Sequence, residues 1–424
     1  MVRNRYGAGR AVLAAAWCAA LAAAAPEARP QTAAPGDTAG PLGPVAVIRP
    51  AGGPLVVVRE QPESRLVAIR VAVELREPAG EAARILAEVV RPRLESGAAE
   101  LGARAAVEVA PSHLVFRVVG PAGEFERLAA LLRRGLVVPA GTTATALDAA
   151  RIQAQARAAA ELDTPGPLLR SLLRDALFPA LAGSQGGETG PAPLTAERLA
   201  QWWAATARPS RVAVTVAGGV EAALVAAEFE DWPAAGAARD RERGPQRPAP
   251  QRASPPAPQV VYRAAGLGYR AHRLDPAVLA VAAALLERRL ARSGIPGATA
   301  ELWWNGENRA LVLLASERAA AAGRDGQAGA SLRERLEAAI ADMADRPAAA
   351  EVLRVRRRLV RDILFAARTA EGMAEVLGQM LDRTGEPMAA HRFLAALQRV
   401  DARAVVTALR ALGRTQPQAV EVAP

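Results

Sequence analysis

Hydrophobic and polar residues alternate along several short stretches of this chain, and longer amphipathic stretches separate them. Segments 66–73 (LVAIRVAV) and 113–120 (HLVFRVVG) have the two-residue period of strands that bury one face. Apolar residues at helical spacing begin at about Glu81 and again over 124–136. The first part of the chain therefore predicts strands and amphipathic helices, closed by a strand at 212–219 (VAVTVAGG).

The second part of the chain repeats this order. A strand-like segment at 259–266 (QVVYRAAG) is followed by a helix from Asp275, a strand at 309–316, a helix at 332–343 and a last strand at 418–424. The same order of elements in both parts indicates duplication of one unit. We therefore expect an α+β fold of two homologous domains, each a mainly antiparallel sheet with helices packed on one face.

Shifts in composition divide the chain. Residues 238–258 combine charge with many prolines, which is typical of a solvated linker, and they separate a domain at 45–237 from a domain at 259–424. Residues 1–25 have a basic start, an apolar run and small residues before a proline, which predicts a secretory signal peptide. Residues 26–44, rich in Pro, Ala and Gly, predict a flexible lead-in.

A signal peptide implies a periplasmic or secreted protein, with an uncleaved membrane anchor as the alternative. The apolar run at 11–25 is short for a membrane span. The single cysteine, Cys18, lies inside this run, so the mature protein would have neither a disulfide nor a thiolate ligand.

The net charge of +10 comes from arginine, because no lysine occurs. Arginine takes the place of lysine throughout the sequence, so we interpret the positive charge as a compositional bias and expect no nucleic-acid partner. The densest run, from Arg354 to Arg361, shares a helix with Val355, Leu359 and Ile363, which predicts the solvated face of a packed helix. A phosphate-binding surface is the alternative.

Two tryptophan pairs, 202–203 and 303–304, suggest either the lining of a peptide cleft or part of the core. We expect each pair to place one ring in the core and the other at the surface. The three histidines, His113, His272 and His391, have no His or Cys partner at ligand spacing, so surface or hydrogen-bonded roles are expected.

The order of segments resembles the insulinase and pitrilysin family of metallopeptidases, in particular its branch similar to the mitochondrial processing peptidase. The likeness covers nearly everything from residue 45 onward. It is carried by LVAIRVAV, LGARAAVEVAPSHLVFRVVG and LTAERLAQWWAATARPSRVAVTVAGGV in the first half, and by PQVVYRAAGLGYRAHRLDPAVLAVAAALL and TAEGMAEVLGQML in the second. The resemblance implies two metallopeptidase-like domains of the LuxS-like and processing-peptidase-like type.

Active members of that family carry the motif H-x-x-E-H on the helix after the first strand, where two histidines bind zinc and the glutamate is the general base. By this resemblance, Ile85 and Val89 occupy the ligand places and Glu88 the base place. Zinc needs lone-pair donors, which aliphatic side chains lack. The third ligand would fall within 151–160, which contains no acid, and Glu161 lies about a turn too late.

The resemblance thus implies an inactive member with no catalytic residue, no metal and no cofactor. Ile85 and Val89 are then expected to be core residues on one stripe with Leu86 of the helix 81–90. Glu88 is expected to be a solvent-facing charge or a relic of the motif.

In two-component members, the non-catalytic subunit supplies an Arg and a Tyr to the substrate from a segment like R-x-x-x-G-L-A-Y. The matching segment here, 288–304, has Gly297 at the Tyr place and Leu290 at the Arg place. Arg289 and Arg292 bracket the Arg place and are the candidate substrate-binding residues. The alternative is an interaction with the last carbonyl groups of their own helix.

Together these features predict the non-catalytic subunit of a secreted or periplasmic peptidase pair, which contributes chamber wall and peptide binding. Its partner would be a zinc-bearing paralogue or a second copy, and its clients would be peptides or unfolded polypeptides. A stand-alone envelope scaffold that holds peptides by strand addition is one alternative. An active hydrolase with a site unlike the family's is the other.

Overall fold

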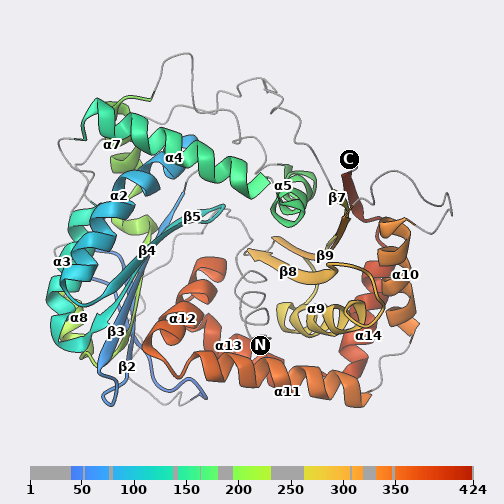
Figure 1. Cartoon of the computed structure of the whole chain (residues 1–424). Coiled ribbons are helices and arrows are strands. Elements are labelled where there is room, and N and C mark those ends of the chain that lie inside the picture. Colours follow the sequence, from blue (N-terminus) through green and yellow to red (C-terminus); the bar gives the residue numbers. More distant parts are fainter. Residues whose placement is uncertain are drawn as a thin grey trace, which may run out of the picture.

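Two β-sheets lie on opposite sides of the molecule, with helices between and around them (Figure 1). The structure, a computed structural model, describes residues 40–50, 53–75, 80–136, 142–162, 164–179, 194–230, 262–305, 308–318, 331–345 and 349–422. The predicted signal peptide, most of the lead-in and the predicted linker at 238–258 lie outside these residues. Within them, no helix has the length and apolar character needed to cross a membrane.

The first sheet has the strand order β1-β2-β6-β3-β5-β4. Its strands are β1 (Ala46–Ile48), β2 (Leu55–Glu60), β3 (Leu66–Glu74), β4 (Arg104–Val109), β5 (His113–Pro121) and β6 (Val212–Gly218). Strands β2 and β6 are parallel, and the other pairs are antiparallel, with Val71 of β3 opposite Phe116 on one side and Val214 on the other. This mixed sheet matches the predicted architecture.

The second sheet is antiparallel throughout and has the order β10-β7-β9-β8. Its strands are β7 (Tyr262–Arg270), β8 (Thr299–Asn305), β9 (Asn308–Arg318) and β10 (Gln418–Val422). The last strand of the described chain, β10, pairs with β7, the first strand of its half, whereas β6, the last strand of the first half, lies between β2 and β3.

Helices fill both halves. The first half contains α2 (Glu81–Glu100), α3 (Phe125–Leu136), α4 (Ala144–Leu162), α5 (Pro165–Leu177), α7 (Ala196–Thr206) and α8 (Ala222–Glu230). The second contains α9 (Pro276–Leu290), α10 (Leu332–Asp345), α11 (Ala349–Ala366), α12 (Ala370–Thr384), α13 (Ala389–Arg399) and α14 (Ala402–Gly413). The α+β class predicted from the sequence is confirmed. Helix α2 continues well beyond the predicted segment 81–90, with Pro92 inside it.

Most helices of each half cover one face of their own sheet, and the opposite face is covered by a helix of the other half. Helix α12 packs on β3 and β6 of the first sheet, and α5 packs on β7, β9 and β10 of the second (Figure 1). This exchange was not predicted. It explains why β3 is buried on both faces: Val67 and Ile69 enter the core of the first half, whereas Ala68 joins the core that contains α12.

Small residues allow the close approach of α5 to the second sheet. A β-carbon at Gly266 would lie 2.5 Å from Leu173, and one at Gly268 would lie 2.6 Å from Leu177. The two leucines of α5 are buried in a separate apolar cluster with Trp303. The glycines in the otherwise apolar strand β7 therefore provide the space in which this helix packs.

The chain before β1 is also held in place. Leu42 is buried, and its carbonyl oxygen accepts a hydrogen bond of 2.9 Å from Arg59 Nε. The Gly43 carbonyl oxygen lies 2.8 Å from Nε2 of His391 on α13. The end of the predicted lead-in thus contacts both halves.

Candidate functional site

The resemblance assigns the zinc motif to helix α2, whose apolar face forms part of the core of the first half. Ile85 and Leu86 have 0% of their surface exposed, and Val89 has 9%. These side chains pack with the inward residues of β3 and β5. The burial agrees with the expectation that Ile85 and Val89 are core residues. A metal has no donor atom at either position.

Glu88 is not solvent-facing, so that part of the interpretation is wrong. Only 9% of its side chain is exposed, and its Oε1 lies 2.9 Å from Arg157 Nε of α4 and 3.3 Å from Arg91 Nη2 of α2. A carboxylate this far from water needs compensating charge or hydrogen bonds. The two guanidinium groups provide both.

Helix α4 delivers Arg157 to this position. Leu147, Ala150 and Ala154 are buried at intervals of three and four residues, so one narrow face of α4 packs along α2. Arg157 follows on the same face one turn later. It belongs to the segment 151–160, where the resemblance places the third zinc ligand. Glu161 falls one further turn along α4.

The donor set on α2 and α4 does not fit zinc. At the motif positions it offers only the carboxylate of Glu88, already bound to two cationic side chains, and neither helix contains a histidine. Across the described parts of the chain, no three His, Cys, Asp or Glu side chains are grouped so that they could hold a metal ion.

The histidines lie apart from α2. His391 is buried on α13 and hydrogen-bonded to the Gly43 carbonyl, and His272 is exposed. His113 Nδ1 lies 2.8 Å from Ser112 Oγ, beside a small cavity of about 50 Å³ that Arg70 and Asp382 also line. Hydrogen-bonded or surface roles are therefore confirmed for all three. The charged surroundings of His113 were not predicted.

A buried ion cluster joins the first sheet to α12. Arg70 of β3 is 3% exposed, and its Nη1 lies 3.2 Å from Asp382 Oδ1 while its Nε lies 3.3 Å from Glu375 Oε2. Arg117 of β5 lies 2.8 Å from Glu375 through Nε and 2.6 Å from Glu108 through Nη1. The sequence did contain a signal, since Arg70 interrupts an otherwise apolar strand.

The charges of this cluster compensate its burial. Burial, the largest single influence, opposes the ionisation of Asp382, but the charges of Arg70, His113 and Arg383 and the hydrogen bond from Arg70 together hold the pKa of Asp382 below its ordinary value. Burial likewise opposes the ionisation of Glu375, and Arg70 and Arg117 together lower the pKa of that carboxyl. Both carboxylates are therefore charged at neutral pH and bind the halves together.

The candidate substrate-binding residues meet at one carboxylate. Arg289 Nη2 donates to Glu351 Oε2 at 2.8 Å, and Arg292 Nη1 lies 4.0 Å from Glu351 Oε1. The hydrogen bond from Arg289 is the main cause of the lowered pKa of Glu351. Leu290 is fully buried, and Gly297 has a φ of 56° in the turn before β8. A substrate role for the two arginines stays a prediction.

The tryptophan pairs differ from each other. Trp203 is buried and Trp202 is partly exposed, as expected. Trp303 and Trp304 are both buried, at 1% and 5%, so the prediction of one surface ring is wrong for this pair. Successive strand residues point to opposite faces of the sheet, and both faces are covered. Trp303 packs with Leu173 and Leu177 of α5. The ring centroid of Trp304 lies 5.4 Å from that of Phe393 on α13.

Comparison with known proteins identifies the fold. No family model matches the sequence, and no curated protein matches it. A solved structure described as an M16-like peptidase from Alicyclobacillus acidocaldarius has a TM-score of 0.64 at 16% identity, over 87% of this chain and 95% of that one. A protease from Helicobacter pylori has a TM-score of 0.70 at 11% identity, over 90% and 99%.

A third structure, described as a peptidase M16 inactive domain from Pseudomonas fluorescens, has a TM-score of 0.61 at 16% identity, over 87% of this chain and 95% of that chain. The chain therefore has the fold of the M16-like peptidases along most of its length.

Proposed function

We propose that this chain is a catalytically silent homologue of the M16-like zinc peptidases. The observation that carries the proposal is the state of α2: Ile85 and Val89 are packed in the core, and Glu88 is bound by Arg91 and Arg157. A general base needs a metal-bound water or another nucleophile to act on, and this arrangement supplies none. The likeness to a protein described as an inactive M16 domain supports the proposal.

Its role, in this proposal, is that of the non-catalytic subunit of a peptidase pair. The described chain keeps both sheets and the exchanged helices although its α2 lacks zinc ligands, and this combination supports a structural contribution. The partner carries the zinc motif, and the two chains enclose peptides or unfolded polypeptide. The predicted signal peptide places this pair in the periplasm or outside the cell.

Activity and metal content test the silent site directly. The purified chain is incubated with a mixture of fluorogenic peptides in the presence of Zn²⁺ or of a chelator, and its zinc content is measured by mass spectrometry. We expect no cleavage and no stoichiometric zinc. Cleavage that co-purifies with the chain and is lost in the Glu88→Gln variant would overturn the proposal. Cleavage unaffected by that variant would instead indicate a hydrolase with an unrelated site.

Copurification tests the pairing. The chain, tagged at its C-terminus, is isolated from its native host and the bound proteins are identified. We expect a zinc-bearing relative in a defined stoichiometry; recovery of only a second copy of the chain would replace the peptidase pair by a silent homodimer. Recovery of the chain alone as a monomer would refute the paired role and leave the silent site unaffected.

A stand-alone peptide-binding scaffold is the second candidate. The sheet order favours it, because β4 and β8 lie at the edges of the two sheets in the described chain. An edge strand presents backbone groups to which an extended peptide can add as a further strand. Peptide binding by the isolated chain, unchanged by addition of a partner, would support the scaffold over the pair.

A further inference from the structure

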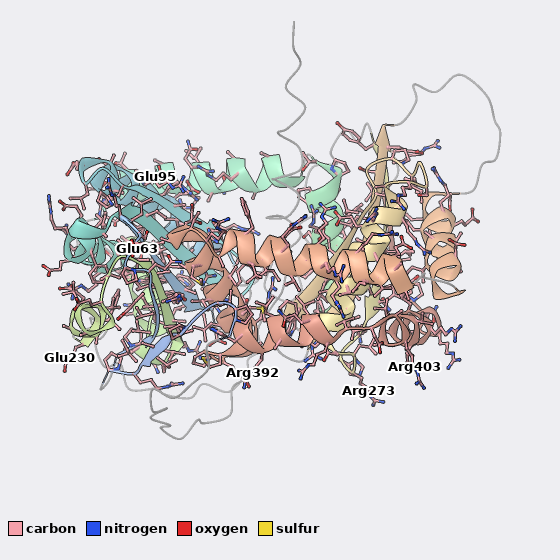
Figure 2. All side chains as sticks on the ribbon, turned by 90° about the horizontal axis from the view of Figure 1, so that it is seen from below. Glu63, Glu95, Glu230, Arg273, Arg392 and Arg403 are labelled. Carbon is pink, nitrogen blue, oxygen red and sulfur yellow. The ribbon has the colours of Figure 1, made fainter. Side chains whose placement is uncertain are left out.

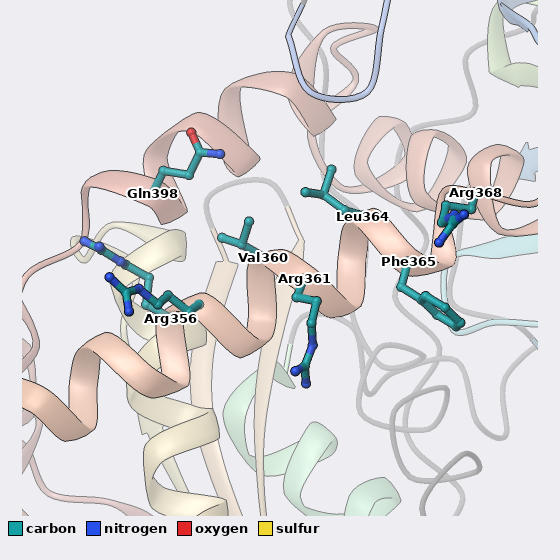
Figure 3. Close-up of a pocket in the computed structure, with 8 residues that line it drawn as sticks. Arg356, Val360, Arg361, Leu364, Phe365, Arg368 and Gln398 are labelled. Carbon is teal, nitrogen blue, oxygen red and sulfur yellow. The ribbon is translucent and has the colours of Figure 1, made fainter.

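Helix α11 carries a groove of about 470 Å³ that combines cationic and apolar side chains (Figure 3). Its cationic members are Arg356, Arg357, Arg361 and Arg368. Its apolar members are Val360, Leu364 and Phe365, and Gln398 of α13 closes one end. These residues include much of the arginine run that the sequence presented as a solvated face.

The lining residues form two rows along the helix, because positions four apart lie one above the other. Val360 and Leu364 point to one side of α11, and Arg361 and Phe365 point to another (Figure 3). From Arg356 to Phe365 the helix rises about 14 Å, at 1.5 Å per residue. An extended peptide covers that distance with about four residues.

The prediction of a packed, solvated helix is partly confirmed. Val355 is buried, and Leu359 and Ile363 are partly buried against the core. A solvated face does not account for Phe365, however, which is 62% exposed between arginines. Together with the partly buried Val360 and Leu364, this ring adds apolar surface beside the arginines, a combination that an amphipathic ligand can use.

The charge of the groove is also unbalanced. Among the side chains that the structure describes, no carboxylate lines it. Arg357 and Arg361 are four residues apart on the helix, a spacing at which like charges repel. Asp362 lies 3.4 Å from Arg361 and from Arg358, but it is outside the lining. The groove therefore presents excess positive charge beside apolar surface.

We propose that this groove binds an extended acidic segment of a partner polypeptide that carries at least one apolar side chain. Guanidinium groups pair with carboxylates in two-point hydrogen bonds, so the arginines select Asp and Glu. The apolar side chain of the ligand packs on the exposed ring of Phe365, in the same row as Arg361. The lining follows about 14 Å of one helix, the length of about four residues of a single extended chain, and its positive charge complements an acidic one. This docking site is independent of α2 and goes beyond the proposed function, so either proposal can fail alone.

Fluorescence anisotropy with the labelled hexapeptide EDLFED tests the groove. The variant Arg357→Gln/Arg361→Gln is compared with the control variant Arg273→Gln/Arg403→Gln, which removes the same charge at two exposed arginines elsewhere (Figure 2). We expect about tenfold weaker binding in the groove variant and less than twofold change in the control, at low ionic strength. Circular dichroism verifies that both variants fold.

The peptides QNLFQN and EDSSED separate the two components of recognition. We expect both to bind more weakly than EDLFED, and we expect Phe365→Ser to weaken EDLFED without affecting EDSSED. Equal losses of affinity for EDLFED in the groove and control variants would overturn the proposal, because the net charge of the protein would then explain the binding. Absence of EDLFED binding would also overturn it. Loss of binding to phosphatidylserine vesicles or to single-stranded RNA in the groove variant, without peptide binding, would reassign the groove to that ligand.

Discussion

Replacement of Arg70 by Met tests whether the buried ion cluster holds α12 on the first sheet. Methionine keeps the unbranched stem that lies against Gly378 of α12, where an added β-carbon would be 2.7 Å from Arg70 Cδ. The substitution removes the guanidinium charge and its hydrogen bonds to Asp382. Asp382 then loses its nearest cation while remaining buried, and Glu375 keeps Arg117.

The expected loss in the free energy of unfolding is about 3 to 5 kcal/mol at pH 7, because one partner of a buried pair is left uncompensated. The matched control is Arg104→Ala, which breaks the pair that Arg104 forms with Glu371 across the same contact between sheet and α12. Their side chains are 69% and 48% exposed, so that loss is expected to stay below about 1 kcal/mol. Urea unfolding followed by tryptophan fluorescence measures both.

The pH dependence of the free energy of unfolding gives a second readout. Acid removes stabilisation from the wild type but relieves a penalty in Arg70→Met. In the wild type, the pKa values of Asp382 and Glu375 are lowered by folding, so their stabilisation is present at neutral pH and is lost as the pH falls through the acid range. Without Arg70, burial raises the pKa of Asp382, and acid relieves the penalty. The difference between wild type and Arg70→Met therefore shrinks from pH 7 to about pH 4. A variant that loses no more stability than Arg104→Ala, or a difference that grows in acid, would refute the reasoning.

Three further substitutions examine the rest of the molecule. Arg157→Ala leaves Glu88 paired with Arg91 alone and is expected to lower the free energy of unfolding by about 1 kcal/mol, measured by urea unfolding. The double variant Arg157→Ala/Glu88→Gln should recover part of that loss. In Ile85→His/Val89→His the imidazoles would enter the core, so the free energy of unfolding is expected to fall by more than about 2 kcal/mol. Isothermal titration calorimetry should show no tight zinc binding to this variant. Gly268→Val should displace α5 from the second sheet, which limited proteolysis of 165–177 would detect; unchanged protection would contradict the close packing.

Local patterns predicted the elements of this fold accurately. The segment 66–73 became β3 (Leu66–Glu74), and the helix expected from Asp275 became α9, with the Asp275 carboxylate as its N-cap. Alternation and capping depend on neighbouring residues, so the sequence displays them directly. The same holds for Ile85 and Val89, whose spacing with Leu86 predicted a buried stripe.

Contacts between distant segments could not be read in this way. Nothing near residue 165 shows that α5 belongs on the second sheet, although Gly266 and Gly268 mark the strand that receives it. The same exchange buried Trp303, because a face expected to meet solvent meets a helix from the other half. Glu88 was misjudged for a related reason: its partner Arg157 lies on another helix.

The exchange of helices bears on why this fold holds together without a metal at α2. In this chain α12 and α5 each cover one face of the sheet of the other half. The contact between the halves is therefore stabilised by apolar surfaces and by the ion cluster of Arg70, none of which includes a residue of α2. At the site itself, aliphatic side chains at 85 and 89 extend the core, and Arg157 balances the one remaining carboxylate. A metal at this position would therefore contribute chemistry that the fold does not need for stability.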